Sequence, residues 1–75
     1  MKLNEHADVV RFLKTVNECP GEVTFCTEDG DCLNLKSALS QYVFVMLFSK
    51  PELLRSGEIR CGEAAAERLR EFMMQ

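Results

Sequence analysis

The chain has 75 residues, of which 47% are apolar and 28% charged, and its formal net charge is −3. This composition predicts one folded domain over residues 1–75 and excludes wholesale disorder. Lys and Arg do not cluster, no apolar run approaches the ~20 residues that span a bilayer, and the first residues lack the apolar core of a signal peptide. We therefore expect a cytoplasmic protein that binds neither nucleic acid nor membrane.

Residues 4–17 are predicted to form an amphipathic helix. Its apolar side chains recur at the i, i+3, i+4, i+7 spacing of one helix face. Asn4 and His6 are the candidate N-terminal caps, and Asp8 suits the positive end of the helix dipole. The Pro-Gly pair at 20–21 ends the helix. The apolar stripe consists of Val9, Phe12, Leu13 and Val16.

A β-hairpin over residues 23–35 is predicted next, and its register follows from the sequence. A three-residue loop, a type I turn with Gly30 in the left-handed region, pairs Thr27 with Asp31 and sets Cys26 opposite Cys32. This register separates polar from apolar side chains, whereas a two-residue loop mixes them on both faces. One face then carries Val23, Phe25, Leu33 and Leu35, and the other carries Thr24, Cys26, Cys32 and Asn34.

Four cysteines, at positions 19, 26, 32 and 61, show no Cys-x-x-Cys spacing. The expected compartment favours free thiols. Two alternatives stay open: a cross-strand bridge between Cys26 and Cys32, and a metal site, from which the one histidine, His6, is distant in sequence. The acidic turn at 28–31 lacks the spacing of a calcium loop, so we expect no metal and no cofactor.

Residues 37–48 are predicted to form a helix, although the unbroken apolar run at 42–48 would also suit a buried strand. Ser37 is a favourable N-cap, and no turn separates it from residue 48. We expect at least half of residues 42–48 to be core and the remaining face to be exposed for a partner or a second copy. The residues expected on this partner surface are Ala38, Leu39, Tyr42, Val43, Met46 and Leu47.

The last third of the chain is predicted to hold a helical turn at 51–54, a short strand at 58–61 and an amphipathic helix at 63–75. The helix has an apolar stripe, and Glu67 and Arg70 are spaced to pair. Its stripe consists of Ala65, Leu69, Phe72 and Met73. The elements together predict an α/β (α+β) open-faced sandwich of order α-β-β-α-β-α. Helices would cover one face of a three-stranded sheet and bury Ile59, while Arg60 would lie on the open face.

Several short motifs resemble HPr, the histidine-containing phosphocarrier of the bacterial sugar phosphotransferase system, minus its first strand. Residues 30–37 read Gly-Asp-Cys-Leu-Asn-Leu-Lys-Ser, which is similar to the Gly-Lys-x-x-Asn-Ala-Lys-Ser of HPr at its hairpin-to-helix junction. Residues 57–69 resemble its last strand and helix, and His6 lies at a helix start as the phosphorylated histidine does. The chain also resembles a group of small uncharacterised proteins of Gram-positive bacteria.

This resemblance implies that Ser37 is a phosphorylation site and that the helix after it meets partners, among them phosphotransferase components. The active-site stretch of HPr reads Gly-Leu-His-Ala-Arg-Pro-Ala, whereas residues 4–10 here read Asn-Glu-His-Ala-Asp-Val-Val. Asp8 therefore stands where the family has an arginine, and Glu5 lies on the other side of His6. Negative charge at this range opposes a doubly charged phosphoryl group.

We therefore expect a non-enzymatic HPr-like protein-interaction or regulatory module, modulated at Ser37. The sequence contains no Ser/His/Asp set, no paired catalytic carboxylates and no Gly-rich phosphate loop. Two alternatives are kept: an active histidine phosphocarrier that uses His6, and a small self-associating protein. The expected assembly is a monomer or a weak homodimer. The position of Ser37 relative to His6 on the surface is the first observation that separates these hypotheses.

Overall fold

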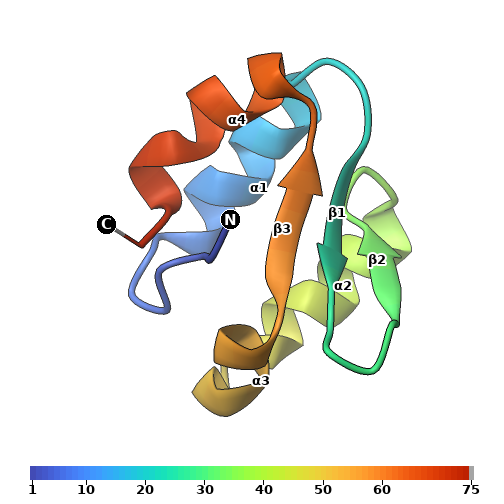
Figure 1. Cartoon of the computed structure of the whole chain (residues 1–75), viewed down its shortest axis with the longest axis vertical. Helices are drawn as coiled ribbons and strands as arrows, with labels where there is room; N and C mark the ends of the chain where they lie inside the picture. The colour runs from blue at the N-terminus through green and yellow to red at the C-terminus, as the bar shows by residue number, and fades with distance from the viewer. Residues whose placement is uncertain (75) are drawn as a thin grey trace.

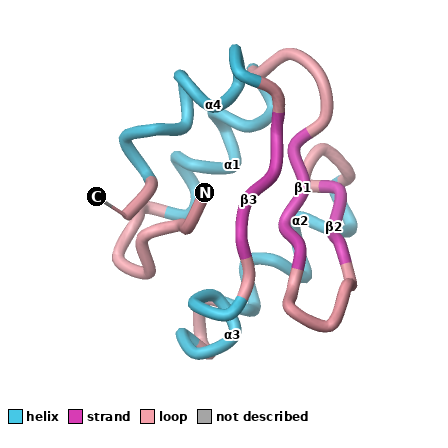
Figure 2. The backbone as a smooth tube through the Cα atoms, in the orientation of Figure 1, coloured by secondary structure: helices cyan, strands magenta, loops and turns pink. Residues whose placement is uncertain are grey.

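The structure is a computed structural model that describes residues 1–74 (Figures 1 and 2). The described chain forms a small α+β domain with four α-helices and one three-stranded antiparallel sheet. A short helix, α3, replaces the predicted helical turn, and Gln75 of the predicted last helix lies outside the described residues. In chain order the elements are α1 (Val9–Glu18), β1 (Val23–Cys26), β2 (Cys32–Asn34), α2 (Ala38–Leu47), α3 (Pro51–Ser56), β3 (Glu58–Cys61), α4 (Glu63–Leu69) and the 3-10 turn η1 (Arg70–Phe72).

The strands lie in the order β2-β1-β3, and β1 pairs antiparallel with both neighbours. The predicted hairpin register is confirmed, with Cys26 directly opposite Cys32. Gly30 has a φ of 92°, and its N–H donates to the carbonyl of Thr27 at 3.1 Å, as the predicted three-residue turn requires. Because β2 and β3 both run antiparallel to β1, they run parallel to each other.

A disulfide bond joins Cys26 to Cys32, which corrects the expectation of four free thiols. The N–H of Thr27 donates to the carbonyl of Asp31 at 2.8 Å, so the next pair toward the strands is a non-hydrogen-bonded pair. Side chains approach each other most closely at such pairs. The Cα atoms of the two cysteines are 4.1 Å apart, and the register itself therefore brings the two sulfurs together.

The core lies between the helices and the predicted apolar face of the sheet. Figure 1 shows α2 passing behind β1 and β2, while α1 and α4 lie side by side next to β3. Ile59 of β3 is buried with the apolar residues of the hairpin, except that Leu33 is only half-buried. From the sheet the core takes Val23, Phe25 and Ile59, and Leu35 joins them directly after β2; from α1 it takes Phe12, Leu13 and Val16.

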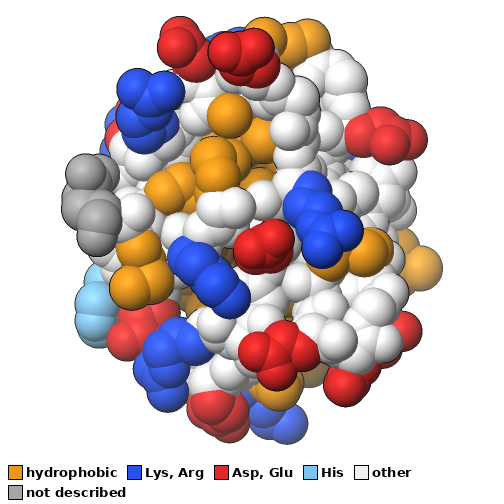
Figure 3. Space-filling view, in the orientation of Figure 1, with side chains coloured by type: hydrophobic (Ala, Val, Ile, Leu, Met, Phe, Trp, Pro, Cys, Tyr) orange, Lys and Arg blue, Asp and Glu red, His pale blue; other side chains and the backbone are white. Residues whose placement is uncertain are grey.

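The opposite face of the sheet carries polar side chains, as predicted. Cys32, Asn34 and Arg60 are exposed and Thr24 is half-buried, whereas Cys26 in the central strand is buried. Figure 3, drawn from the same side as Figure 1, shows basic and acidic side chains spread over the region of β1 and β3. The sheet therefore presents a charged, mixed surface on this side, and the helices cover the other.

Residues 1–7 run alongside β3 and the C-terminal segment, and the prediction of helix from residue 4 is wrong. The amino group of Met1 donates to the carbonyl of Ile59 at 3.1 Å, and the N–H of Ile59 donates back to Met1 at 2.7 Å. Leu3 forms an isolated antiparallel bridge with Met73 and is buried. These partners are more than fifty residues apart in sequence, so no local pattern predicts them.

The cap of α1 also differs from the prediction. The helix begins at Val9 with Asp8 as its N-cap, and the Asp8 carboxylate accepts the N–H of Arg11 at 3.1 Å. The Asn4 side chain instead accepts the N–H of His6 at 2.9 Å and forms a turn two residues long. Neither of the two predicted caps therefore caps the helix, because both lie in that turn.

At the other end of the chain, α4 is shorter than predicted. It stops at Leu69 and tightens into η1, after which Met73 leaves helical geometry to pair with Leu3. The whole predicted apolar stripe of this segment is buried. The predicted Glu67–Arg70 ion pair is present, with 3.9 Å between its charged atoms.

Candidate functional site

Helix α2 confirms the helical prediction for this segment and is anchored by one aromatic side chain. Within Ala38–Leu47, all of it described, Phe44 is the fully buried residue. Its ring centroid lies 5.2 Å from that of Phe25, 5.8 Å from Phe12 and 5.6 Å from Phe48. These separations suit edge-on aromatic packing, so the inner side of α2 belongs to the aromatic centre of the core.

The outer side of α2 is an exposed apolar stripe. Leu39 is 76% exposed, Tyr42 70% and Met46 61%, and Val43 is also exposed. Their spacing of i, i+3, i+4 and i+7 places them on one side of the helix. We call these four residues the α2 outer face. Isolated exposed apolar residues are common on proteins, but a continuous stripe is typical of an interaction site.

The predicted partner surface needs two corrections. Leu47 is half-buried and packs against the core, so it does not belong to the surface, while Ala38 is exposed as predicted. Val45 is exposed although it was not predicted to be. The core takes fewer residues of the 42–48 segment than expected, since beyond Phe44 only Leu47 and Phe48 are partly buried. A single helix lying on a small sheet contacts it on one side only, which leaves the other residues outside.

The α2 outer face carries no formal charge, because residues 38–47 contain no Asp, Glu, Lys or Arg. Lys36 precedes the helix, and its amine donates to the carbonyl of Cys19. Lys50 follows the helix and is exposed. The outer face is thus a neutral apolar stripe with a lysine beyond each end, which suits an apolar partner surface.

Ser37 occupies the N-cap position of α2, as predicted. Its φ and ψ of −87° and 129° are extended, and its carbonyl accepts the N–H of Gln41 at 2.9 Å. Its side chain, however, makes no capping hydrogen bond within the described chain. Ser37 is half-buried, so part of the residue remains accessible to solvent. The Ser37 hydroxyl is therefore not used to cap the helix.

Ser37 and His6 lie at opposite ends of α1. The Gln41 side chain donates to Asn17 at 2.7 Å, which ties the start of α2 to the C-terminal end of α1. His6 precedes the N-terminal end of the same helix, which is ten residues long and hence about 15 Å from end to end. The structure thus does not gather the two candidate modification sites into one cluster.

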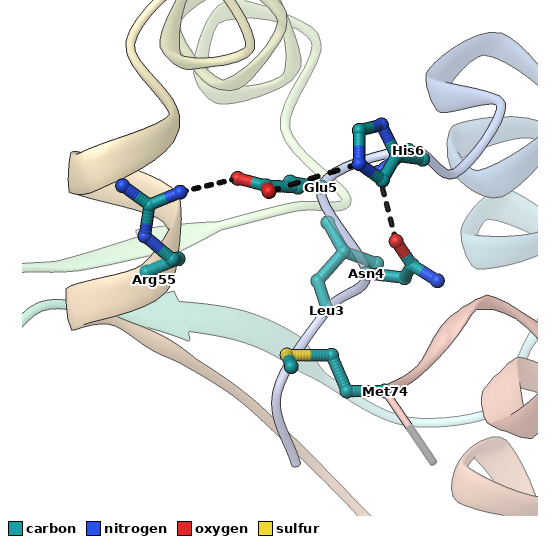
Figure 4. Close-up of a pocket in the computed structure, with 6 residues that line it drawn as sticks. All are labelled: Leu3, Asn4, Glu5, His6, Arg55 and Met74. Atoms are coloured by element: carbon teal, nitrogen blue, oxygen red, sulfur yellow. Dashed lines mark hydrogen bonds and ion pairs between the residues drawn. The ribbon is translucent and has the colours of Figure 1, made fainter.

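His6 lines a shallow cavity of about 280 Å³ at the start of the chain (Figure 4). Its Nε2 atom is 3.8 Å from the Glu5 carboxylate, and the other oxygen of Glu5 accepts from Arg55 at 2.7 Å. The His6 side chain is 87% exposed. The remaining lining residues are Leu3, Asn4 and Met74.

Arg55 is a cation near His6 that no pattern in the sequence indicates. It comes from α3, fifty residues along the chain, and no sequence signal links it to His6. Glu5 lies between the guanidinium of Arg55 and the imidazole of His6. Because its carboxylate already pairs with Arg55, the guanidinium is not free to bind a phosphoryl group on His6. The Glu5 carboxylate therefore opposes an anionic group on His6.

The half-buried Cys61 thiol is a further potential nucleophile. Burial raises its pKa above the usual 9.0, the nearby Cys19 thiol raises it further, and the N-terminal amine lowers it in part. A thiolate is the reactive form of cysteine. At neutral pH Cys61 is therefore protonated and is a poor candidate for covalent catalysis.

Among residues 1–74, no group of three or more His, Cys, Asp or Glu side chains is arranged to hold a metal ion. No helix in that part of the chain is long and apolar enough to cross a membrane. A scan against protein-family models and searches of curated proteins and of solved structures found no match to this chain. Its function must accordingly be inferred from its own residues.

Proposed function

We propose that this chain is a non-enzymatic, HPr-like protein-interaction module that docks a partner protein through the α2 outer face. The observation that carries the proposal is the exposed stripe formed by Leu39, Tyr42, Val43 and Met46. It lies on a helix whose inner side alone is used by the core. The docking surface is thus free in the monomer while the fold stays intact.

The expected gain from covering this face is substantial. Burying a Leu or Met side chain contributes about 1.5–3 kcal/mol, and two of the four residues are of this kind. Tyr42 adds a large flat side chain with a polar tip, and tyrosines are enriched among residues that dominate interface energies. A partner with a complementary apolar groove would therefore obtain most of its affinity from these few side chains.

The resemblance to HPr supports the same surface from a different direction. The similar stretch, Gly30–Ser37, leads directly into α2, and HPr is thought to meet its partners with the equivalent helix. Components of a phosphotransferase system are therefore the first partners to test.

Ser37 is proposed as the position that modulates docking. A phosphate there would add about two negative charges at the end of a neutral apolar stripe, next to Ala38 and close to Leu39. Those charges would have to be desolvated against an apolar partner, so docking should weaken. Ser37→Asp is expected to lower binding severalfold and Ser37→Ala to leave it unchanged. Equal binding by both variants would remove Ser37 from the proposal.

Site-specific photo-crosslinking in the native host tests the docking surface. A photoreactive phenylalanine analogue replaces Tyr42 in one variant and Val10 in another; Val10 is 74% exposed but lies on α1. We expect discrete higher-mass products from position 42 and few from position 10. Equal or absent products from both positions would contradict the proposal.

Self-association is the second candidate, because an uncharged face can meet its own copy without like-charge repulsion. It predicts that the mass measured by sedimentation equilibrium rises with concentration and that Met46→Lys abolishes the rise. A monomer at millimolar concentration would exclude this candidate while leaving docking to another protein untouched.

Phosphate transfer through His6 is tested separately. Incubation with phosphoenolpyruvate and the first enzyme of the phosphotransferase system should give an acid-labile label on His6 if the chain is a carrier. The Glu5 carboxylate beside the imidazole argues against this outcome. We expect no label above that of the His6→Ala variant.

A further inference from the structure

The two bridged cysteines differ sharply in exposure. Cys26 belongs to the central strand β1 and is 5% exposed, whereas Cys32 belongs to the edge strand β2 and is exposed. Both lie on the sheet face that the helices leave uncovered. An attacking thiolate must approach a disulfide along the line of the sulfur–sulfur bond. The Cys32 sulfur is therefore accessible to a thiolate from solvent, whereas the Cys26 sulfur is largely shielded.

From this asymmetry we propose that the bridge is a thiol–disulfide exchange site attacked at Cys32. The incoming thiolate forms a new bond to Cys32 Sγ, the bond between Cys26 and Cys32 breaks, and its electron pair leaves on Cys26 Sγ. Solvent then protonates the Cys26 thiolate. The products are a mixed disulfide on Cys32 and a free thiol on Cys26. The incoming thiol is oxidised as Cys26 is reduced, so no other oxidant or reductant is required.

The surroundings of Cys26 suit its role as the leaving group. The Thr24 hydroxyl donates to the Arg60 carbonyl at 3.4 Å, and its oxygen lies 3.8 Å from Cys26 Sγ. Once that sulfur is a thiolate, the hydroxyl can rotate and donate a weak hydrogen bond to it instead. A cavity of about 300 Å³ adjoins Cys26, and its lining includes the cations Lys2 and Arg60 as well as the carboxylates of Glu28 and Glu58. Water in this cavity can hydrate the Cys26 thiolate and supply its proton.

The charges around Cys32 indicate which thiols react. Three carboxylates of the turn lie within four residues of it, and all are exposed. On the cavity side Arg60 pairs with Glu58 at 3.8 Å, which leaves Lys2 as the cation opposing the turn. The local balance is therefore negative, and thiols that carry positive charge should approach most readily. The turn carboxylates are those of Glu28, Asp29 and Asp31.

The test compares three small thiols on the oxidised full-length chain. Cysteamine is cationic, 2-mercaptoethanol is neutral and 3-mercaptopropionate is anionic; each is used at the same thiolate concentration and low salt. Exchange is stopped with N-ethylmaleimide, and peptide mass mapping locates the mixed disulfide. We expect the adduct on Cys32 with maleimide on Cys26, and a rate for cysteamine about fivefold or more above that for 3-mercaptopropionate.

Two further measurements isolate the cause of the preference. Salt at 1 M should largely remove the preference for the cationic thiol, because at this concentration even charges a few ångströms apart are screened from each other. The exposed substitution Asp31→Asn should reduce it at low salt while leaving the rate with 2-mercaptoethanol nearly unchanged. The proposal is overturned if the adduct forms mainly on Cys26, or if the anionic thiol reacts as fast as the cationic one.

Discussion

At Gly57 a side chain as small as a methyl group would collide with the core. A Cβ atom built there would lie 2.8 Å from Cε1 of Phe25 and 2.9 Å from the carbonyl oxygen of Cys26. The backbone of Gly57, with φ of −106°, would otherwise accept any residue. The requirement for glycine is therefore steric, and it comes from the central strand.

The first prediction follows from this contact. Gly57→Ala should lower the free energy of unfolding by about 1–3 kcal/mol, because Phe25 must move within a packed core. Urea denaturation followed by circular dichroism measures the change. Gly62→Ala is the matched control, since a Cβ there meets nothing within 4 Å and should cost only about 0.5 kcal/mol through weaker capping. Equal losses for both variants would show that the Phe25 contact is not decisive.

The second prediction concerns the Cys61 thiol, whose pKa burial raises above 9.0. The unfolded thiol then ionises at lower pH than the folded one, so the folded state retains its proton longer. This contribution to stability is fully present below pH 9 and is lost as the pH rises above it. The wild-type chain should therefore lose more stability between pH 8 and pH 10 than Cys61→Ala does. Parallel urea midpoints for the two proteins over that range would refute the assignment.

At the residue scale, the sequence predicted what depends on neighbours along the chain. Gly30 in the left-handed region and Cys26 opposite Cys32 both follow from one turn and one alternating pattern. The charge environment of His6 did not follow, because Arg55 arrives from a helix fifty residues away. The disulfide was predicted only as an alternative, because the register places the sulfurs together while the choice between thiol and bridge depends on redox conditions.

Among the elements, α2 carries apolar side chains of two kinds, one packed in the core and the other exposed to solvent. Phe44 faces three aromatic rings, whereas Tyr42 faces solvent. Phe44→Leu should lower the free energy of unfolding by about 1–2 kcal/mol, since it opens space and removes ring contacts. Tyr42→Gln should change it by less than about 0.5 kcal/mol, as exposed substitutions do. Chemical denaturation measures the free energy of unfolding of both variants. A loss of stability for Tyr42→Gln as large as that for Phe44→Leu would show that the outer face is part of the core.

The hairpin gives the fourth prediction. Its disulfide links residues six apart, and closing so short a loop contributes about 2 kcal/mol by limiting the unfolded chain. Reduction should therefore lower the melting temperature by roughly 10 °C for a domain of this size. Calorimetry with and without a phosphine reductant measures the shift. The double variant Cys26→Ser/Cys32→Ser serves as the control, and it should not respond to the reductant.

Element types were predictable where periodicity and turn residues agree, as in the hairpin and in α2. The start of α1 and the end of α4 were not predictable, because both depend on contacts between distant segments, the pairing of Leu3 with Met73 and of Met1 with Ile59. The division of α2 into an inner and an outer side was predicted in part, because the expected partner surface contained all four residues of the α2 outer face. The exposure of Val45 and the partial burial of Leu47 were not predicted, since they depend on how the helix packs on the sheet.

Taken as a whole, the molecule keeps its helices on one side of the sheet and leaves two contrasting surfaces. One is the charged open face of the sheet, which bears the disulfide. The other is the neutral α2 outer face, and Ser37 lies just before the helix that carries it. Because these surfaces lie on different elements, substitutions in one should leave the other intact.

Two methionines offer the most direct measurement of whether the α2 outer face is covered in the cell. Met46 lies on that face and is 61% exposed, while Met74 lies near the C-terminus, outside α2, and is 59% exposed. Brief hydroxyl-radical footprinting should oxidise them to similar extents in the purified chain at low concentration. In intact cells we predict that Met46 is protected severalfold relative to Met74. An unchanged ratio of Met46 to Met74 oxidation in cells would contradict the docking function.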